Sequence, residues 1–329
     1  MAQETIRPTV ARDSPTNDSP AQKKLRAELR SSGLKLCYQS RRHGNSELYV
    51  MDADGANSVN ITNTPDVDEV YPHVSAEGQR VCFTTVAAED GGVRFDVHWM
   101  NMDGSNRTLV AGDATDPCWD PSGTKIAFVK RLGRTKTGDY QNAGLFVYDI
   151  RTGRYEETTA GKLYHAYVPC WSPAGDWVIA TVHEHADFGH AIVAIDLQDI
   201  RISALKGHAA LHLRLKEGVN GCRPDFSWDG KMLCWNPDDY HIYVARFSPD
   251  RLVRGRAVAQ APEGGSVYHG DWSPDGQYIA YSMTADVKSS NARTRGLWDI
   301  FAARADGSVY VQLTFDHANS KQPEFFSPA

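Results

Sequence analysis

The chain of 329 residues lacks the long apolar runs and the one-sided charge that mark several protein classes. No stretch approaches the roughly 20 consecutive apolar residues of a membrane helix, so no membrane span is expected. Its 35 basic and 41 acidic residues give a net charge of −6, which excludes a general nucleic-acid coat. Any site for an anion must therefore be local.

The N-terminal region lacks the apolar segment of a secretory signal. Its first thirty residues are polar and charged, with no hydrophobic stretch behind Met1. We therefore expect a cytoplasmic protein, or a periplasmic one if a signal peptide has been removed.

Cysteine is scarce, and no Cys-x-x-Cys pair occurs, which argues against a zinc ribbon or a thioredoxin-type site. Five of the six cysteines recur at fixed distances from a repeated glycine: Cys37, Cys82, Cys118, Cys170 and Cys234. They are predicted to be buried, reduced thiols rather than a disulfide framework. The absence of Gly-x-Ser-x-Gly, Walker and dinucleotide-binding motifs argues against serine hydrolase, ATPase and dehydrogenase activities.

One pattern does return along the chain: an aromatic residue, Ser or Asp, often Pro, a turn Gly and an apolar strand. It is clear at Trp119-Asp-Pro-Ser-Gly, Trp171-Ser-Pro-Ala-Gly, Phe226-Ser-Trp-Asp-Gly and Trp272-Ser-Pro-Asp-Gly. The turn glycines lie 45 to 55 residues apart, at Gly33, Gly78, Gly123, Gly175, Gly230 and Gly276. This period matches a four-stranded propeller blade, so six blades are predicted.

The two ends of the chain complement each other. The chain stops at Pro323-Glu-Phe-Phe, which has the pattern of an innermost strand, whereas the first unit opens at Ser32, after that strand should have passed. We predict an all-β fold: a six-bladed β-propeller, residues 32–329, closed by pairing the C-terminal inner strand with N-terminal strands. Residues 1–31 form a polar extension in which 21–30 are expected to form a short helix.

These repeats resemble the TolB-like propeller repeat family, of the PD40 or WD40-like type, over residues 32–329. The resemblance specifies the fold more than the function. TolB itself has a separate N-terminal α/β domain, for which 31 residues leave no room.

Histidines gather on one face of the predicted propeller. The loops between second and third strands share this face with the blade-to-blade connections, and together they hold eleven of the 12 histidines. Histidine binds transition metals and acts as a base near neutral pH, so this face is the predicted site. Basic sectors in its loops favour an anionic ligand. Long polar loops would also collect histidine and solvated charge without any function.

Two arrangements suggest a metal. His183 and His185 share one side of an extended strand, and His190 returns on the next strand, which suits zinc or another divalent ion. Short pairs of this kind also arise by chance.

The second is a narrower resemblance. Tyr268-His269-Gly270-Asp271-Trp272 is similar to a segment of oligogalacturonate lyases in which a histidine helps to hold a divalent metal. The resemblance implies metal-assisted β-elimination on uronate chains, in which a base removes a proton and a cation stabilises the developing charge. It implies His269 as a metal ligand with His317 and Gln322 as neighbours, and manganese, calcium or zinc as the ion.

Arg223 stands where the lyase pattern has its catalytic histidine. An arginine neutralises a carboxylate well, but its high pKa makes it a poor base. His165 and Tyr164 are the alternative bases, so the catalytic candidates are His165 and Arg223. The candidates for ligand binding are His73, Arg223, Tyr268 and His317.

The sequence is compatible with two functions. One is a ligand-binding propeller with a His- and Arg-containing funnel for a small anionic molecule or a uronic-acid oligosaccharide, with lyase activity as an extension. The other is a non-catalytic, TolB-like scaffold for protein–protein interaction. An enzyme should bring His165, Arg223, His269 and His317 within about one ligand's width of each other, whereas a scaffold need not.

Overall fold

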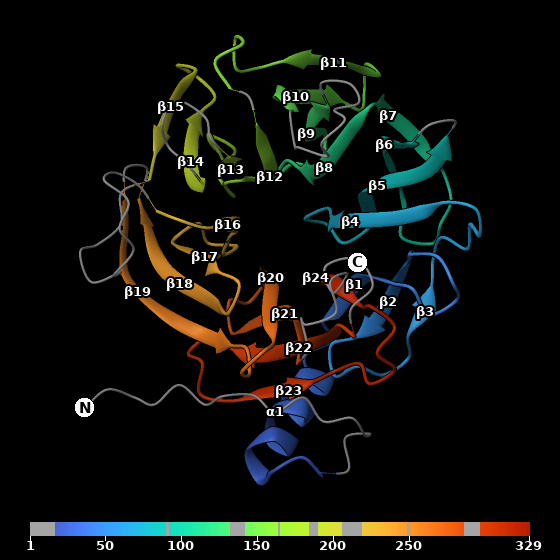
Figure 1. The fold of residues 1–329 in the computed structure, drawn as a ribbon, viewed down its shortest axis with the longest axis vertical. Helices are drawn as coiled ribbons and strands as arrows, with labels where there is room; N and C mark the ends of the chain where they lie inside the picture. The colour runs from blue at the N-terminus through green and yellow to red at the C-terminus, as the bar shows by residue number, and fades with distance from the viewer. Residues whose placement is uncertain are drawn as a thin grey trace.

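Six four-stranded antiparallel sheets surround a central axis in the computed structural model (Figure 1). The structure describes residues 17–89, 92–131, 142–163, 165–183, 190–205, 219–248, 251–285 and 297–329. The predicted six-bladed propeller is confirmed. Its closure is confirmed as well, because the last strand joins the first three in one sheet.

Each blade begins with its innermost strand, next to the axis. Blade 1 contains β24 Lys321–Phe326, β1 Lys35–Ser40, β2 Glu47–Asp52 and β3 Val59–Asn60. Blade 2 contains β4 Asp68–Val74, β5 Arg80–Glu89, β6 Gly92–Asn101 and β7 Thr108–Gly112. Blade 3 contains β8 Ala114–Trp119, β9 Lys125–Arg131, β10 Asn142–Asp149 and β11 Arg154–Glu157.

The second half of the chain repeats this order. Blade 4 contains β12 Ala166–Trp171, β13 Trp177–His183, β14 His190–Asp196 and β15 Arg201–Ala204. Blade 5 contains β16 Cys222–Phe226, β17 Met232–Asp238, β18 His241–Ser248 and β19 Arg251–Gln260. Blade 6 contains β20 Ser266–Trp272, β21 Tyr278–Thr284, β22 Asp299–Arg304 and β23 Tyr310–Gln312.

The repeated Ser-Pro-Asp-Gly motif forms the turn between the first two strands of a blade. In blade 6 the Ser273 amide donates to the Tyr278 carbonyl at 3.0 Å, and Ser273 Oγ donates to Asp275 Oδ1 at 2.6 Å. Gly276 takes a φ of 68°, a left-handed conformation that glycine adopts without steric cost. The motif therefore sets the conformation of this turn.

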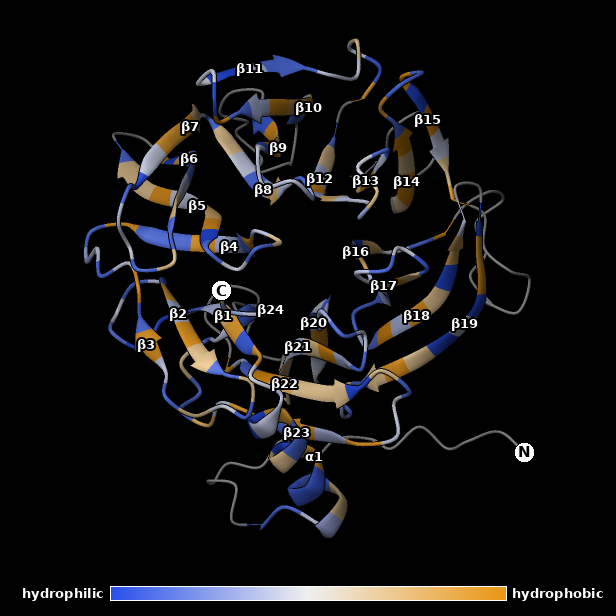
Figure 2. Cartoon of the chain, turned by 180° about the vertical axis from the view of Figure 1, so that it is seen from behind, coloured by the Kyte–Doolittle hydropathy of each residue, from blue (hydrophilic) through white to orange (hydrophobic). Residues whose placement is uncertain are grey.

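Hydrophobic clusters fill the space between neighbouring blades. Between blades 5 and 6, buried residues such as Val244, Trp272 and Tyr281 pack together. Figure 2 shows hydrophobic residues on the strands of every blade, with hydrophilic ones interleaved. All six cysteines are buried and none forms a disulfide, which agrees with the prediction made for the five at repeated positions.

Helix α1, Pro20–Ser31, begins at a capping box. The Gln22 amide donates to Ser19 Oγ at 3.3 Å, and the Ser19 amide donates to Gln22 Oε1 at 3.0 Å. Pro20 fits the first helical position because its missing N–H has no partner there in any helix. Among the described residues, no helix combines the length and the apolar content of a membrane span.

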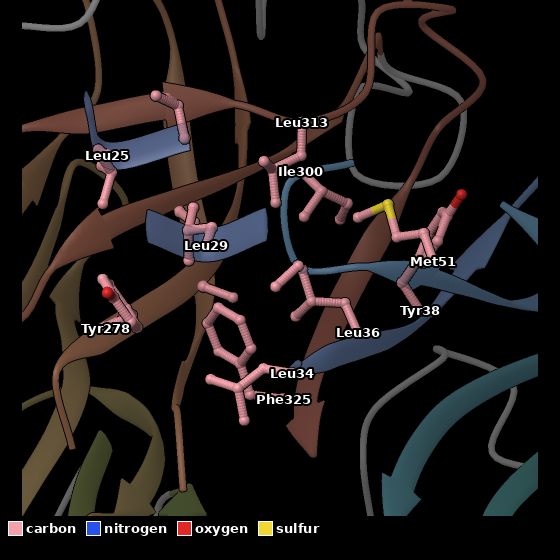
Figure 3. Packing of buried hydrophobic residues seen from close by; sticks show 14 of the residues in the cluster. Leu25, Leu29, Leu34, Leu36, Tyr38, Met51, Tyr278, Ile300, Leu313 and Phe325 are labelled. Atoms are coloured by element: carbon pink, nitrogen blue, oxygen red, sulfur yellow. The ribbon is translucent and has the colours of Figure 1, made fainter. Parts of the chain in front are cut away.

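This helix covers the junction at which the propeller closes. Figure 3 shows Leu25 and Leu29 among side chains of blade 1 and blade 6, including Leu36 and Ile300. Arg26 donates to the Asp54 carbonyl of blade 1 and to the Gln312 carbonyl of blade 6, each at 2.9 Å. Helix α1 thus connects the first blade to the last.

Candidate functional site in the channel

The same irregularity interrupts all six innermost strands. In each, the pairing with the second strand shifts register across two or more residues. At each shift one non-glycine residue has a φ between 49° and 61°. These six residues, called the first layer below, are Tyr71, Asp116, Val168, Arg223, His269 and Gln322.

Polar side chains of the preceding blade hold this unusual backbone in place. The Arg223 amide donates to Thr181 Oγ1 at 3.0 Å, and the Gln322 amide donates to Ser282 Oγ at 2.9 Å. The His269 amide donates in the same way to Asn236 Oδ1 at 3.2 Å. These bonds satisfy amides that the bulge removes from the sheet, so the surrounding structure sustains a conformation that is otherwise unfavourable.

The bulges place side chains from all six blades around one pocket of about 70 Å³. A single water needs roughly 10 to 15 Å³ on this measure, so the pocket has room for a few waters or for the head of a small ligand. The whole first layer lines it. So do five members of a second layer two residues further along each strand: His73, Cys170, Asp225, Asp271 and Glu324. Cys118 occupies the sixth position of that layer.

Arg223 is the principal cation of the first layer. Its guanidinium carbon lies 4.7 Å from the centroid of the Tyr268 ring, and its Nη1 donates to Cys222 Sγ at 3.1 Å. Its Nε is buried and has no hydrogen-bond partner among the described residues. Burial opposes the charge, but Cys222 and other nearby groups hold the pKa of Arg223 above its ordinary value. The side chain therefore carries a full positive charge that the described residues only partly satisfy.

The charge of Arg223 lowers the pKa of two further basic groups. Burial, the charge of Arg223 and then that of Lys321 lower the pKa of His269 well below its ordinary value, so its imidazole is neutral at pH 7. His269 Nδ1 is also buried without a partner in the described part of the chain. Burial and then Arg223 lower the pKa of Lys321 to about 7, and its Nζ lies 4.8 Å from the Trp298 ring centroid. This side of the first layer is therefore electropositive.

Asp116 brings the opposite charge to the first layer. Burial raises its pKa to about 6, and Arg223 counteracts part of that rise. Its own amide donates to Thr84 Oγ1 at 3.2 Å. The carboxyl group can therefore exchange a proton close to neutral pH.

The second layer forms a closed ring of contacts between blades. Trp119 donates its amide to His73 Nδ1 at 3.3 Å, Trp272 donates to Asp225 Oδ2 at 3.1 Å, and Phe325 donates to Asp271 Oδ2 at 2.6 Å. The same relation holds for the remaining three, through the amides of the next blade: Trp171 with Cys118, Phe226 with Cys170, and Val74 with Glu324. Each blade thus accepts one backbone hydrogen bond from the next.

Three acids occupy consecutive places in this ring. Burial raises the pKa of Asp225 to about 6, and it raises the pKa of Asp271 and Glu324 well above their ordinary values. Their mutual repulsion adds to the rise for Asp271 and Glu324. The acidic arc therefore retains protons at a pH at which exposed carboxyl groups have lost them.

The structure brings some of the predicted site residues together. His73, Arg223, His269 and Gln322 all line the pocket. Tyr268 is not on the pocket wall, but its ring lies against Arg223 and is 5.9 Å from the His269 ring. The Tyr268 hydroxyl donates to Asp239.

Two other predicted residues lie away from the pocket wall. His317 hydrogen-bonds through Nδ1 to buried Asp299 Oδ2 at 2.7 Å. His165 precedes β12, where its amide donates to the Asn142 carbonyl at 3.0 Å. Their predicted roles in catalysis and ligand binding remain predictions.

The predicted metal ligands are only partly gathered. His269 and Gln322 meet at the pocket, whereas His317 is engaged by Asp299. Among the residues that the structure describes, no group of three or more His, Cys, Asp or Glu side chains is arranged to hold a metal ion. Metal binding at this pocket therefore stays a prediction. His185 and Tyr164 lie outside the described residues, as do the side chains of His183 and His190.

Sequence reasoning missed most of the second layer and half of the first. Tyr71, Asp116 and the three acids of the arc were not candidates. A signal for them exists, since in five of the six repeats the first-layer residue precedes a proline: Pro72, Pro117, Pro169, Pro224 and Pro323. The sixth repeat has Gly270, where a Cβ atom would approach Ile242 Cγ2 to 3.0 Å.

No known family matches the sequence, and no curated protein sequence matches it. Solved structures do share the fold. A TolB-type protein from Agrobacterium tumefaciens is 16% identical, with a TM-score of 0.58 over 85% of this chain and 88% of that one. A chain in a nidogen/laminin complex is 10% identical, with a TM-score of 0.61 over 90% of this chain and 100% of that one.

An oligogalacturonate lyase in complex with manganese is 11% identical, with a TM-score of 0.49 over 84% of this chain and 87% of that one. TolB-like propellers and oligogalacturonate lyases, the two groups that the sequence resembles, are thus both among the structural neighbours. At these identities the likeness shows the fold alone.

Proposed function

We propose that the channel pocket binds a small anionic ligand and that Arg223 is its principal cation. The observation that carries this proposal is the state of Arg223, which lines the pocket with a buried, unpartnered Nε. No side chain of the described residues forms a salt bridge with it. A charged guanidinium with an unpartnered donor and no salt bridge can offer that donor to a bound anion.

The surrounding residues favour a carboxylate attached to a hydroxylated body. A guanidinium presents a fork of donors that matches a carboxylate, and Lys321 adds charge on the same side. Gln322 and Asp116 supply amide and carboxyl groups for hydroxyl partners elsewhere on the pocket wall. Together with the sequence resemblance around His269, these groups make a uronic acid, free or at the end of an oligosaccharide, the ligand class that we propose.

Lyase activity is an extension of this proposal. In β-elimination next to a carboxylate, Arg223 would neutralise the acid group, and a neutral base would take the proton alpha to it. His269 is the pocket histidine suited to that step, because its imidazole is neutral and its Nδ1 has no partner among the described residues. This replaces His165 as the preferred base, since His165 does not line the pocket.

Calorimetric titration with galacturonate tests the binding proposal, and galactose, which lacks the carboxylate, is the matched ligand control. We expect galacturonate to bind and galactose to bind at least tenfold more weakly. This ratio corresponds to the free energy of the charge-assisted hydrogen bond that galactose cannot form. Arg223→Met should reduce galacturonate affinity by about 10- to 100-fold, and Arg223→Lys should restore part of it. Equal binding of both sugars would contradict the role of Arg223.

Incubation with oligogalacturonate, with and without added manganese, tests the extension. Ultraviolet absorbance from unsaturated products that disappears in His269→Phe would support lyase activity. Binding without products would leave a non-catalytic receptor. If no acidic sugar and no simple carboxylate binds, the protein-interaction scaffold becomes the better reading.

A further inference from the structure

The second layer contains a pair of cysteines whose contacts differ from those of the other thiols. Cys118 of β8 and Cys170 of β12 belong to adjacent innermost strands, and their side chains are in hydrogen-bond contact. Cys118 Sγ also lies 3.3 Å from His73 Nε2, and Cys170 Sγ lies 3.2 Å from Asp225 Oδ1. Cys170, His73 and Asp225 line the pocket.

The ring of backbone contacts determines which nitrogen of His73 carries the hydrogen. In a neutral ring the Trp119 amide, which donates to Nδ1, leaves the hydrogen on Nε2. Burial lowers the pKa of His73, but Cys118 and Asp225 outweigh it and raise that pKa above its ordinary value, and a protonated ring carries a hydrogen on Nε2 as well. The Nε2–H group therefore donates a hydrogen bond to Cys118 Sγ. The Trp171 amide donates to the same sulfur. Two donors thus converge on Cys118, as in the surroundings that stabilise a thiolate.

The two sulfurs differ in acidity. Burial raises the pKa of the Cys118 thiol, but contact with Cys170 and then the charge and the hydrogen bond of His73 outweigh it and bring the pKa well below the ordinary value. Cys170 has the opposite shift, because its contact with Cys118, its burial and the Asp225 charge all raise its pKa. Cys118 is therefore the sulfur of the pair that ionises more readily, and Cys170 is the one that holds its proton, beside Asp225.

We propose that Cys118 and Cys170 form an oxidation site that a small peroxide reaches through the channel pocket. The Cys118 thiolate attacks one oxygen of hydrogen peroxide, the O–O bond breaks, and the departing hydroxide takes a proton from the solvent to become water. Cys118 is then a sulfenic acid. Cys170 passes its proton to Asp225 and attacks that sulfur. The S–S bond forms, the S–O bond breaks, and the leaving hydroxide takes the proton from Asp225 as a second water.

This reaction oxidises two sulfurs by one electron each and reduces one peroxide to two waters. It links blade 3 to blade 4 beside the ligand pocket. It does not depend on the anionic ligand or on any activity proposed above.

The test uses the full chain, reduced, freed of reductant and exposed to hydrogen peroxide. After catalase treatment the protein is denatured, remaining thiols are alkylated with N-ethylmaleimide, and digested peptides are identified by mass spectrometry. We expect a disulfide between Cys118 and Cys170 while the other four cysteines remain alkylated. Cys118 should react at least about tenfold faster than Cys234, another buried thiol, which instead donates to the Gly270 carbonyl.

Three variants sharpen the result. In Cys170→Ser, Cys118 should proceed to sulfinic acid because no neighbouring thiol resolves it. In Cys118→Ser, Cys170 should remain alkylated, whereas Cys234→Ser should form the disulfide as the unsubstituted chain does. The wild-type measurement alone decides the proposal if a variant fails to fold. Full alkylation of Cys118 and Cys170, or equal oxidation of Cys234, would overturn it.

Discussion

The two layers of the channel differ in how their polar groups are used. In the first layer, Arg223 and His269 hold buried nitrogen atoms without partners among the described residues. In the second layer, every side chain accepts a backbone amide of the next blade. The layers are only two residues apart in the sequence and both reach the pocket, yet the first keeps unpartnered nitrogen atoms there and the second closes a ring of hydrogen bonds.

This difference follows from the bulge between them. The left-handed backbone turns the first-layer side chain toward the pocket and gives its amide to a side chain of the preceding blade. Two residues later the strand has returned to regular pairing, and the side chain reaches the next blade. Substitutions in the second layer should therefore cost stability, and those in the first layer should mainly cost binding.

The largest expected effect is on the pH dependence of stability. Burial raises the folded-state pKa of Asp225 from about 4 to about 6, so its stabilising contribution is complete below about pH 4 and is lost as pH rises through 6. A shift of about two units corresponds to roughly 3 kcal/mol. Urea unfolding at pH 4.5 and 7.5 should show that Asp225→Asn removes much of this loss. Asp149→Asn, at the end of β10, should leave the pH dependence over this interval unchanged, because hydrogen bonds from Arg151 lower the pKa of Asp149 to about 2. An equal effect in that variant would contradict the assignment.

The second effect concerns the ring of backbone contacts. Asp271→Ala removes the acceptor of the buried Phe325 amide and should lower the free energy of unfolding by about 1 to 3 kcal/mol. Asp271→Asn keeps an oxygen at that place and should cost much less. Both are best measured by chemical denaturation at pH 5, where repulsion among the acids is small. Similar losses for the two variants would show that the hydrogen bond is not what Asp271 contributes.

The third prediction is that a first-layer substitution changes the free energy of unfolding very little. Arg223→Met keeps an apolar stem against Tyr268 and removes a buried charge, so we expect a change of less than about 1 kcal/mol in the free energy of unfolding. Because Arg223 lowers the pKa of His269, that pKa should rise in the variant and be visible by NMR titration. A large loss of stability would make Arg223 a structural residue.

The smallest effect is on ligand affinity. Lys321 has a pKa of about 7, so it is charged at pH 6 and largely neutral at pH 8. Galacturonate should therefore bind more weakly as pH rises across this interval, by about two- to fivefold. Calorimetry of Lys321→Met should show a flat profile over the same range. A profile that stays as steep in this variant would assign the titration to another group, such as Asp116.

The periodic glycines predicted the number of blades, because a turn residue recurs wherever the fold repeats a hairpin. The mismatch between the first and last units predicted the closure, since an incomplete blade needs its missing strand. The residues of the site were harder to predict than the fold. Arg223, His269, Gln322 and His73 were candidates and do line one pocket, but His317 is held by Asp299 instead.

The repeat, the turns and the burial of the cysteines follow from the order of residues, because these features depend on local conformation and on hydrophobic periodicity. Which side chains meet depends instead on how the six sheets pack. Six residues, each separated from the next by about a blade of sequence, share one pocket because the sheets close around an axis. The lowered pKa values of Cys118 and His269 likewise arise from neighbours on other blades. The distances between such groups depend on the packing of the blades and cannot be read from the order of residues along the chain.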